Sequence, residues 1–277
     1  MKKKIFLSAL LISIFFSTNL HSITYLDYTD EPVFSLNPVN EIIQFSVGLS
    51  LTGSSLLCDK VFHIKNNNFD NWEKDYKLVP YMEMFLMAPY NKTLHYVGTG
   101  TAALALLTPG VMALTPNDQW LTIGLMYTET LLWAYGIKDW GKLLINRPRP
   151  YMYFDNFPMD KVEEGDWNCS FPSGHTTLAF TGAAFTTYLF HQYFPESQWR
   201  LAVTGISFGI ATLTGILRIA SGNHFLGDVM MGAIIGTVCG VAVPYMHTSR
   251  FYQKFQKKNK TEVTVTPFGF NAKFYLD

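Results

Sequence analysis

The chain of 277 residues is hydrophobic and electrically balanced: 48% of its residues are hydrophobic, 16% aromatic and only 15% charged, and 21 basic residues offset 21 acidic ones. A typical protein has about 25% charged residues, so the deficit is large. Zero net charge, without a basic stripe along the sequence, excludes a nucleic-acid-binding surface.

The first 22 residues, MKKKIFLSALLISIFFSTNLHS, place three lysines before an apolar stretch and end in small and polar residues. This order is typical of a secretory signal peptide. Leu20 fits poorly at the −3 position of a cleavage site after Ser22, so an uncleaved N-terminal anchor is the alternative. In both cases we expect the following segment to begin outside the cytoplasm.

The next segment, residues 23–94, is largely polar and rich in turn-forming and aromatic residues, and we predict an extracytoplasmic region. Residues 41–58 within it are moderately apolar, which leaves open whether they cross the membrane. A short amphipathic helix is expected near residues 81–87.

Five longer apolar segments follow, each near the roughly 20 residues that a helix needs to cross a bilayer. They contain Gly, Ala, Ser and Thr at close intervals, as closely packed membrane helices do. The segments are residues 95–114, 119–141, 174–193, 200–220 and 226–246. They predict an all-α, membrane-embedded bundle of about five or six apolar helices over residues 95–246. Because the mean hydropathy is only +0.11, a soluble helical bundle is the alternative.

Residues 247–277 form a basic C-terminal tail. Its cations suit the cytoplasmic side of a membrane, and five crossings from an exported start would end there. These cations are Arg250, Lys254, Lys257, Lys258 and Lys260. Beyond them the chain alternates as a β-strand does.

The three cysteines, Cys58, Cys169 and Cys239, have no spacing typical of a metal site. Cys239 lies in an apolar segment and is expected to be a packing residue. A disulfide between Cys58 and Cys169 after export and two free thiols are both compatible with the sequence.

A first polar cluster, KLLINRPRP, ends the segment 119–141 and brings together Lys142, Arg147 and Arg149. Two prolines stop the helix at this point. The planar fork of arginine matches phosphate oxygens. The alternative is a basic anchor that faces lipid head groups.

A second cluster, PSGH, begins the segment 174–193. Ser173 is a good N-cap, and Gly174 lets a ligand approach the backbone. Helix N-termini bind anions through their free N–H groups, and His175 in the first turn could donate a proton. An ordinary cap followed by an interfacial histidine is the alternative.

A third cluster, RIASGNHFLGD, follows the segment 200–220 and places His224 and Asp228 four residues apart. On a helix capped by Asn223 the two would share one face. A carboxylate that holds an imidazole fixes its tautomer and makes it a better nucleophile. The alternative is a structural His–Asp hydrogen bond.

The three segments that carry these clusters, residues 119–141, 174–193 and 200–220, would cross the membrane in alternating directions. All three clusters are therefore expected at one membrane face. Two histidines, at least three cations and two helix N-termini would meet there, which predicts a binding site for a phosphoryl group.

Together the clusters resemble the signature of the type 2 phosphatidic acid phosphatase superfamily, Lys-x6-Arg-Pro, Pro-Ser-Gly-His and Ser-Arg-x5-His-x3-Asp. KLLINRPRP matches the first part, PSGH the second, and Arg218 through Asp228 the third. Leu217 stands where the family has Ser. Trp140 stands where a register based on Arg147 would need Lys, so we prefer Lys142 with Arg149.

The resemblance implies a mechanism without a metal or another cofactor. His224 would attack phosphorus and become phosphohistidine, Asp228 would orient it, and His175 would protonate the leaving oxygen and then activate water. The expected phosphate-binding residues are Lys142, Arg149, Ser173, Gly174 and Arg218.

The expected function is therefore that of a multi-pass enzyme of a bacterial-type inner membrane, with its active site facing the periplasm. Its substrate would be a lipid phosphate or pyrophosphate, such as undecaprenyl pyrophosphate, phosphatidylglycerol phosphate, phosphatidic acid or a lipid A phosphate. The superfamily also implies alternatives, a soluble periplasmic acid phosphatase and, less favoured, a vanadium haloperoxidase. Leu217 favours a third, a non-catalytic lipid-binding or transport protein. We further expect the aromatic loop 151–169 to border the site and select substrate.

Overall fold

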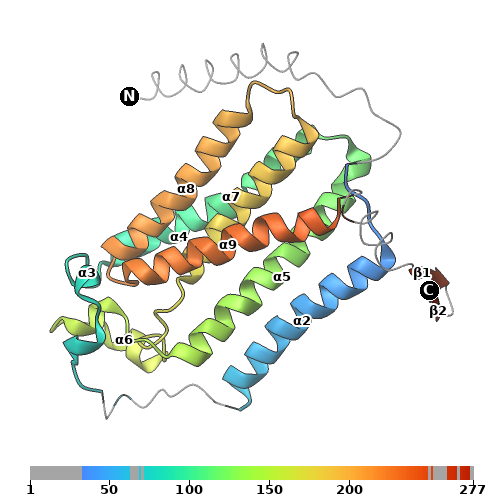
Figure 1. Cartoon of the computed structure of the whole chain (residues 1–277). Helices are drawn as coiled ribbons and strands as arrows, with labels where there is room; N and C mark the ends of the chain where they lie inside the picture. Colours follow the sequence, from blue (N-terminus) through green and yellow to red (C-terminus); the bar gives the residue numbers. More distant parts are fainter. Residues whose placement is uncertain are drawn as a thin grey trace.

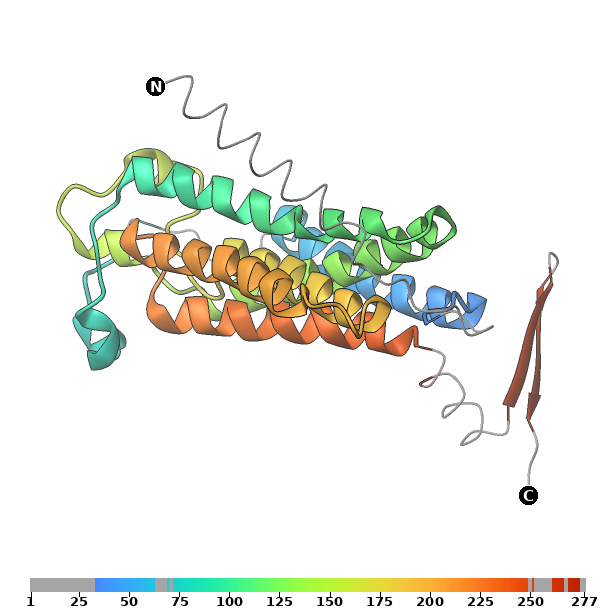
Figure 2. The same cartoon turned by 90° about the horizontal axis from the view of Figure 1, so that it is seen from above.

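The computed structural model describes residues 33–62, 69, 72–248, 251, 261–266 and 269–274. The predicted signal peptide and most of the basic tail lie outside these residues. Within them, the fold is a bundle of long helices that lie side by side (Figures 1 and 2). The long helices are α2 (Pro38–Lys60), α4 (Lys92–Leu106), α5 (Trp120–Ile145), α7 (Gly174–Tyr193), α8 (Arg200–Ala220) and α9 (Leu226–Met246).

The five predicted apolar segments correspond to α4, α5, α7, α8 and α9, and the all-α bundle is confirmed. Short elements connect them: α3 (Tyr81–Met84), α6 (Met159–Glu163) and the 3-10 turns η2 (Tyr76–Leu78), η3 (Thr108–Leu114), η4 (Asn117–Gln119) and η5 (Pro150–Tyr153). The alternating tail forms an antiparallel hairpin of β1 (Thr261–Thr266) and β2 (Gly269–Phe274).

Helix α7 lies at the centre of the bundle and contacts α4, α5, α8 and α9. Small residues make these contacts possible, because backbones can then approach closely. A Cβ atom on Gly182 would collide with the Ala105 carbonyl of α4, and one on Gly236 of α9 would collide with the Thr177 carbonyl of α7. The Gly, Ala and Thr content that the sequence shows in these segments therefore sets the spacing of the helices.

We predict that Gly236→Ala destabilises the protein by about 1–3 kcal/mol, because the added methyl group meets backbone atoms that cannot move independently. Gly205→Ala in α8 is the matched control, since a Cβ there meets no atom within 4 Å. Denaturation in detergent micelles would compare the two variants. Equal stability of both would contradict this account of the α7–α9 contact.

Residues 41–58, whose crossing the sequence left open, lie in α2, which packs along α5. The indole Nε1 of Trp140 donates to Ser54 Oγ at 3.1 Å, and Gly136 faces Leu51. Trp140 therefore faces α2. The two helices run in the same direction, so α2 belongs to the bundle instead of preceding it.

This sixth long helix changes the topology that five crossings predict. The start of α2 and the end of α9 lie at the same end of the bundle: Phe34 bridges Thr248, and the Ser35 N–H donates to the His247 carbonyl at 3.0 Å. If all six helices cross, an exported residue 23 and a cytoplasmic basic tail are therefore incompatible.

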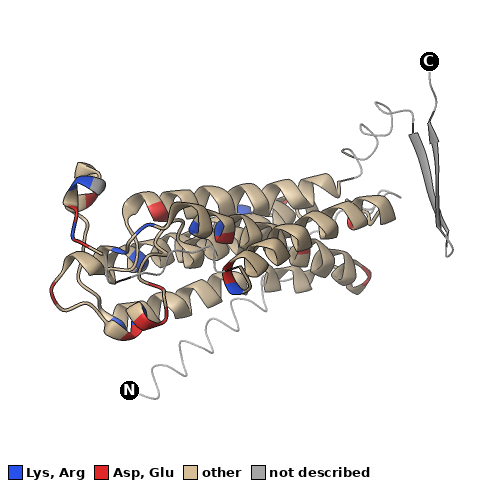
Figure 3. Cartoon of the chain, turned by 90° about the horizontal axis from the view of Figure 1, so that it is seen from below, with Lys and Arg blue, Asp and Glu red and all other residues tan. Residues whose placement is uncertain are grey.

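Four helices of the described chain are long and apolar enough to cross a membrane: residues 38–60, 92–114, 200–220 and 226–246. Many of their large apolar side chains face outward, and Leu201 is 83% exposed. Charged residues are sparse along much of the helix length (Figure 3). These properties identify a membrane protein. The predicted spans α5 and α7 fall outside this set of four.

The three cysteines are free thiols. Cys169 and Cys239 are buried and Cys58 is half-buried, so the structure has the free-thiol arrangement and not the disulfide.

Candidate active site

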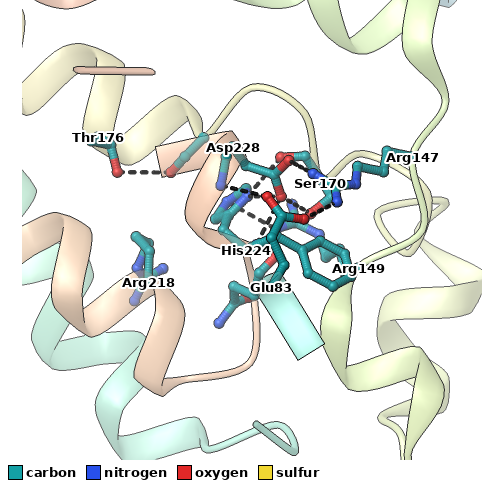
Figure 4. Close-up of polar contacts among 12 residues, drawn as sticks. Glu83, Arg147, Arg149, Ser170, Thr176, Arg218, His224 and Asp228 are labelled. Carbon is teal, nitrogen blue, oxygen red and sulfur yellow. Dashed lines mark hydrogen bonds and ion pairs between the residues drawn. The ribbon is translucent and has the colours of Figure 1, made fainter. Parts of the chain in front are cut away.

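The three sequence clusters lie at the end of the bundle that carries α3 and α6 (Figure 1). Arg149 contacts His224, and the Ser173 N–H donates to the Asp228 carbonyl at 3.0 Å. Residues that are more than 50 positions apart in the chain therefore meet in one cluster (Figure 4).

The hydrogen bonds of His224 fix its tautomer. The Arg149 guanidinium, which can only donate, lies 3.0 Å from Nε2, and the Ser170 carbonyl, which can only accept, lies 2.7 Å from Nδ1. The proton of the neutral ring is therefore on Nδ1, and Nε2 carries the lone pair. His224 is only 2% exposed, so this arrangement is well shielded from water.

Arg149 is held rigidly by protein groups on three sides. Its guanidinium donates to the Asp166 carboxylate at 2.7 Å, to the Asp166 carbonyl at 2.8 Å and to the Asn223 carbonyl at 2.9 Å. Asp166 thus balances the charge of a buried cation, as buried charges require. With the contact to His224, four of its five N–H groups are used, so an anion would take the fifth and compete for the one that faces His224.

Burial, and after it the positive charge of Arg149, lowers the pKa of His224 to about 4. If neutral His224 is the nucleophile, kcat/KM corrected for substrate titration should stay high from pH 7 to 5 and fall only as the pH approaches 4. An ordinary histidine, with a pKa near 6.5, would lose activity between pH 7 and 5. His224 stays neutral in the folded state, whereas an unfolded chain would protonate it below about pH 6.5. Lowering the pH from 6.5 towards 4 therefore also favours unfolding. Thermal denaturation at each pH separates the effect on activity from the effect on stability. A fall of kcat/KM with an apparent pKa near 6.5, in protein that is still folded, would contradict the prediction.

Asp228 lies near His224, but their contact differs from the predicted one. The helix begins at Leu226 with Phe225 as N-cap, so Asn223 is not the cap and His224 precedes the helix. Asp228 Oδ2 is 3.8 Å from His224 Nδ1, which is too far for a hydrogen bond. The difference arises because the Ser170 carbonyl takes the Nδ1 proton.

The Asp228 carboxylate instead forms hydrogen bonds to the two segments that contact or adjoin His224, at Ser170 and at Phe225. Oδ2 accepts from Ser170 Oγ at 2.5 Å and from the Phe225 N–H at 2.8 Å, while Oδ1 accepts from Arg147 at 2.5 Å. Ser170 supplies both this hydroxyl and the carbonyl that orients His224. Asp228 therefore positions the histidine through the two segments that flank it.

Arg147, the third cation of the first cluster, is already neutralised. It forms ion pairs with Asp228 and with Glu83 of α3, and it stacks over the Phe225 ring at 4.1 Å. Glu83 also accepts from the Gly227 N–H at 2.7 Å, and so occupies the N-terminus of α9. The sequence offered no signal for Glu83, because α3 precedes the bundle helices with which it pairs.

Lys142 differs from Arg147, because in the described chain its ammonium group has no ion-pair or hydrogen-bond partner. It lies beside Gly174, where an added Cβ would be 3.7 Å from Nζ. Ser173 is fully buried, and its hydroxyl contacts Thr176 Oγ1 at 2.9 Å without capping the helix. The free N-terminus of α7 and an unpaired ammonium group therefore lie side by side, an arrangement suited to an anion.

Arg218 and His175 lie on the side of the cluster next to α4. Arg218 donates to the carbonyls of His95 and Leu94, the latter at 3.2 Å, and His175 Nε2 contacts Thr99 Oγ1 at 3.2 Å. The His95 ring lies 6.4 Å from that of His175 and contacts Asn223 at 3.3 Å. His95 and Thr99 were not among the predicted site residues, although their spacing of four residues places both on one face of a helix.

Residues 123–252 match the family model described as PAP2 superfamily. This match confirms the resemblance read from the three clusters, all of which lie inside the matched range. This region, a little under half of the chain, is therefore similar to the PAP2 superfamily.

Curated relatives share part of this region. The chain is 42% identical over 111 residues to Lipid A 1-phosphatase of Porphyromonas gingivalis, a match that covers 37% of this chain and 23% of that protein. It is 30% identical over 137 residues to Lipid phosphate phosphatase 2 of Arabidopsis thaliana, covering 41% and 46% of the two chains. The matches thus span about a quarter to a half of these relatives.

Among solved structures, the chain is similar to the PAP2-type phosphatidylglycerolphosphate phosphatase of Bacillus subtilis. The likeness has a TM-score of 0.42 and 20% identity, and covers 79% of this chain and 96% of that one. It concerns the overall fold alone.

Proposed function

We propose that this protein is a membrane phosphatase that hydrolyses a lipid phosphate or pyrophosphate through a phosphohistidine on His224. The observation that carries the proposal is the state of His224, whose Nε2 lone pair faces the Arg149 guanidinium at 3.0 Å in a buried site. A neutral imidazole beside a fixed cation can attack phosphorus while the cation stabilises the charge on the phosphoryl oxygens.

In the first step, the phosphoryl group displaces the hydrogen bond that Nε2 of His224 accepts from Arg149, and Nε2 forms a bond to phosphorus as the bond from phosphorus to the lipid oxygen breaks. His175 gains a proton as the anionic phosphate binds and passes it to that leaving oxygen. In the second step, neutral His175 takes a proton from water, whose oxygen attacks phosphorus and releases inorganic phosphate and His224. Lys142, Arg149 and Arg218, with Ser173 and the Gly174 N–H, would hold the phosphoryl oxygens.

A lipid is the preferred substrate because the site lies at the end of a bundle with apolar outer faces. The names of two relatives, Lipid A 1-phosphatase and Lipid phosphate phosphatase 2, support the same class. The aromatic loop after Arg149 buries Tyr151, Tyr153 and Trp167. We therefore propose that these side chains support the residues of the site, and that they do not form a large contact surface for the lipid.

The position of the site supports a location on the periplasmic side of an inner membrane. The basic segment after α9 follows the end of the bundle opposite the site, and such segments favour the cytoplasm. In this orientation the start of α2 is cytoplasmic as well, which differs from the export of residue 23 that the N-terminal sequence predicts.

The test is phosphate release by the detergent-purified protein, measured with and without EDTA. Undecaprenyl pyrophosphate, phosphatidylglycerol phosphate, phosphatidic acid and a lipid A phosphate are supplied in parallel with p-nitrophenyl phosphate, and His224→Ala serves as the blank. Turnover of one lipid, abolished in the variant, supports the proposal. Turnover of the soluble ester alone would indicate a general acid phosphatase, and phosphate binding without any turnover would indicate a lipid-binding protein.

A further inference from the structure

A second polar cluster lies at the end of the bundle opposite the candidate active site. It consists of Glu41 in the first turn of α2, Glu129 in α5 and His247 just after α9. His247 Nε2 is 3.1 Å from Glu41 Oε1 and 3.0 Å from Glu129 Oε2. Two carboxylates and one imidazole nitrogen therefore face a common point.

These groups are buried, and the close contacts among them lack the geometry of hydrogen bonds. Glu129 and the His247 side chain are 0% exposed, and the Glu41 side chain is 16% exposed. Both carboxylate oxygens of Glu41, both of Glu129 and Nε2 of His247 lack a hydrogen-bond partner. Unsatisfied polar atoms are costly at such depth, so a cluster of five points to a missing positive group.

The remaining nitrogen of His247 shows how the ring is oriented. Nδ1 lies 2.9 Å from the Val243 carbonyl and therefore donates a proton to it. A backbone carbonyl on the far nitrogen is the usual support of a metal-binding histidine, because it turns the lone pair of Nε2 towards the metal. The two imidazole–carboxylate distances of 3.0 and 3.1 Å match the edges of a coordination shell with metal–ligand distances near 2.0–2.1 Å, and the three ligand atoms all lie within 4.8 Å of one another.

We propose that Glu41, Glu129 and His247 bind one divalent transition-metal ion, with Zn²⁺ as the best match to their oxygen and nitrogen donors. A divalent cation would bring the two carboxylates and a neutral imidazole to zero net charge. A protonated His247 would leave the buried cluster with one excess negative charge. The ion would join α2, α5 and α9 at this end of the bundle.

This site would be structural and separate from catalysis. The 21 residues of α9 lie between it and the candidate active site, a rise of about 30 Å. The metal site can therefore be tested without an assay of phosphatase activity, and the result does not depend on whether the proposed phosphatase function is correct.

The experiment uses the full chain, purified in detergent, stripped with a chelator and dialysed against Zn²⁺. Elemental analysis should find about one Zn²⁺ per chain, and the thermal midpoint should rise on loading. Glu129→Gln and His247→Gln should each lose the bound ion, whereas the control His191→Ala, a histidine outside the cluster, should keep it. In the wild type, Co²⁺ should give visible absorption bands that Zn²⁺ removes, a readout that does not depend on whether the variants fold.

The competing explanation is an ionic clamp by a protonated His247. Although burial lowers it, the pKa of His247 is raised to about 9 by the adjacent Glu129 and Glu41 carboxylates. A stripped wild type that binds neither Zn²⁺ nor Co²⁺, or variants that retain the full equivalent, would overturn the metal site in favour of this clamp.

Discussion

His224→Ala is expected to abolish turnover of every substrate, with a loss that approaches a million-fold. Removing a nucleophile that forms a covalent intermediate has an effect of about this size, because the remaining groups can no longer split the reaction into two steps. The variant keeps the three cations that we assign to phosphate binding, so substrate affinity should change much less than kcat.

The measurement is a rapid acid-free quench with a ³²P-labelled substrate. The wild type should retain label that is stable in alkali and lost in acid, as phosphohistidine is, and His224→Ala should retain none. His191→Ala is the matched control, because His191 contacts Thr204 and Arg200 far from the cluster. Label that persists in the His224 variant would assign the nucleophile to another residue.

Asp228→Ala is expected to reduce both stability and turnover. The carboxylate is fully buried and accepts from Ser170, Phe225 and Arg147. Breaking a buried ion pair by removing one partner typically costs about 3–5 kcal/mol. Because the same carboxylate joins the segments on both sides of His224, kcat should fall along with the free energy of unfolding.

Chemical denaturation in micelles would measure the first effect and phosphate release the second. Asp155→Ala is the control, since Asp155 is an exposed partner of Lys74 and its removal should leave stability unchanged. Asp228→Asn should retain more stability than Asp228→Ala, because an amide oxygen can still accept from the Phe225 N–H. A fully active and stable Asp228→Ala would contradict the positioning role that the geometry suggests.

The sequence predicted the helices well and the polar contacts only in part. The segments 174–193, 200–220 and 226–246 coincide with α7, α8 and α9, because each is an uninterrupted run of about 20 largely apolar and small residues. Spacing alone could not place the Nδ1 proton of His224, which depends on a carbonyl 54 positions away. Nor could it pair Arg147 with Glu83, since α3 reaches the site only through the tertiary fold.

Residues 41–58 show a second limit of sequence reasoning. Their composition is only moderately apolar, yet they form a full helix because α5 offers Leu132 and Trp133 as packing partners for Gly48. Whether a helix packs into a bundle depends on its own surface and on that of its partner, so the sequence of residues 41–58 alone does not predict the contact with α5.

The described bundle has an even number of long helices, and its two ends meet where Phe34 bridges Thr248. This arrangement has a consequence for the movement of lipids between the two leaflets. The proposed chemistry belongs to a single leaflet, the one at the far end from that bridge. A lipid whose phosphate is made on the other side would have to be flipped before it could be hydrolysed. The dephosphorylated product would be released in the leaflet that contains the site, and it would have to be flipped again to reach the other leaflet.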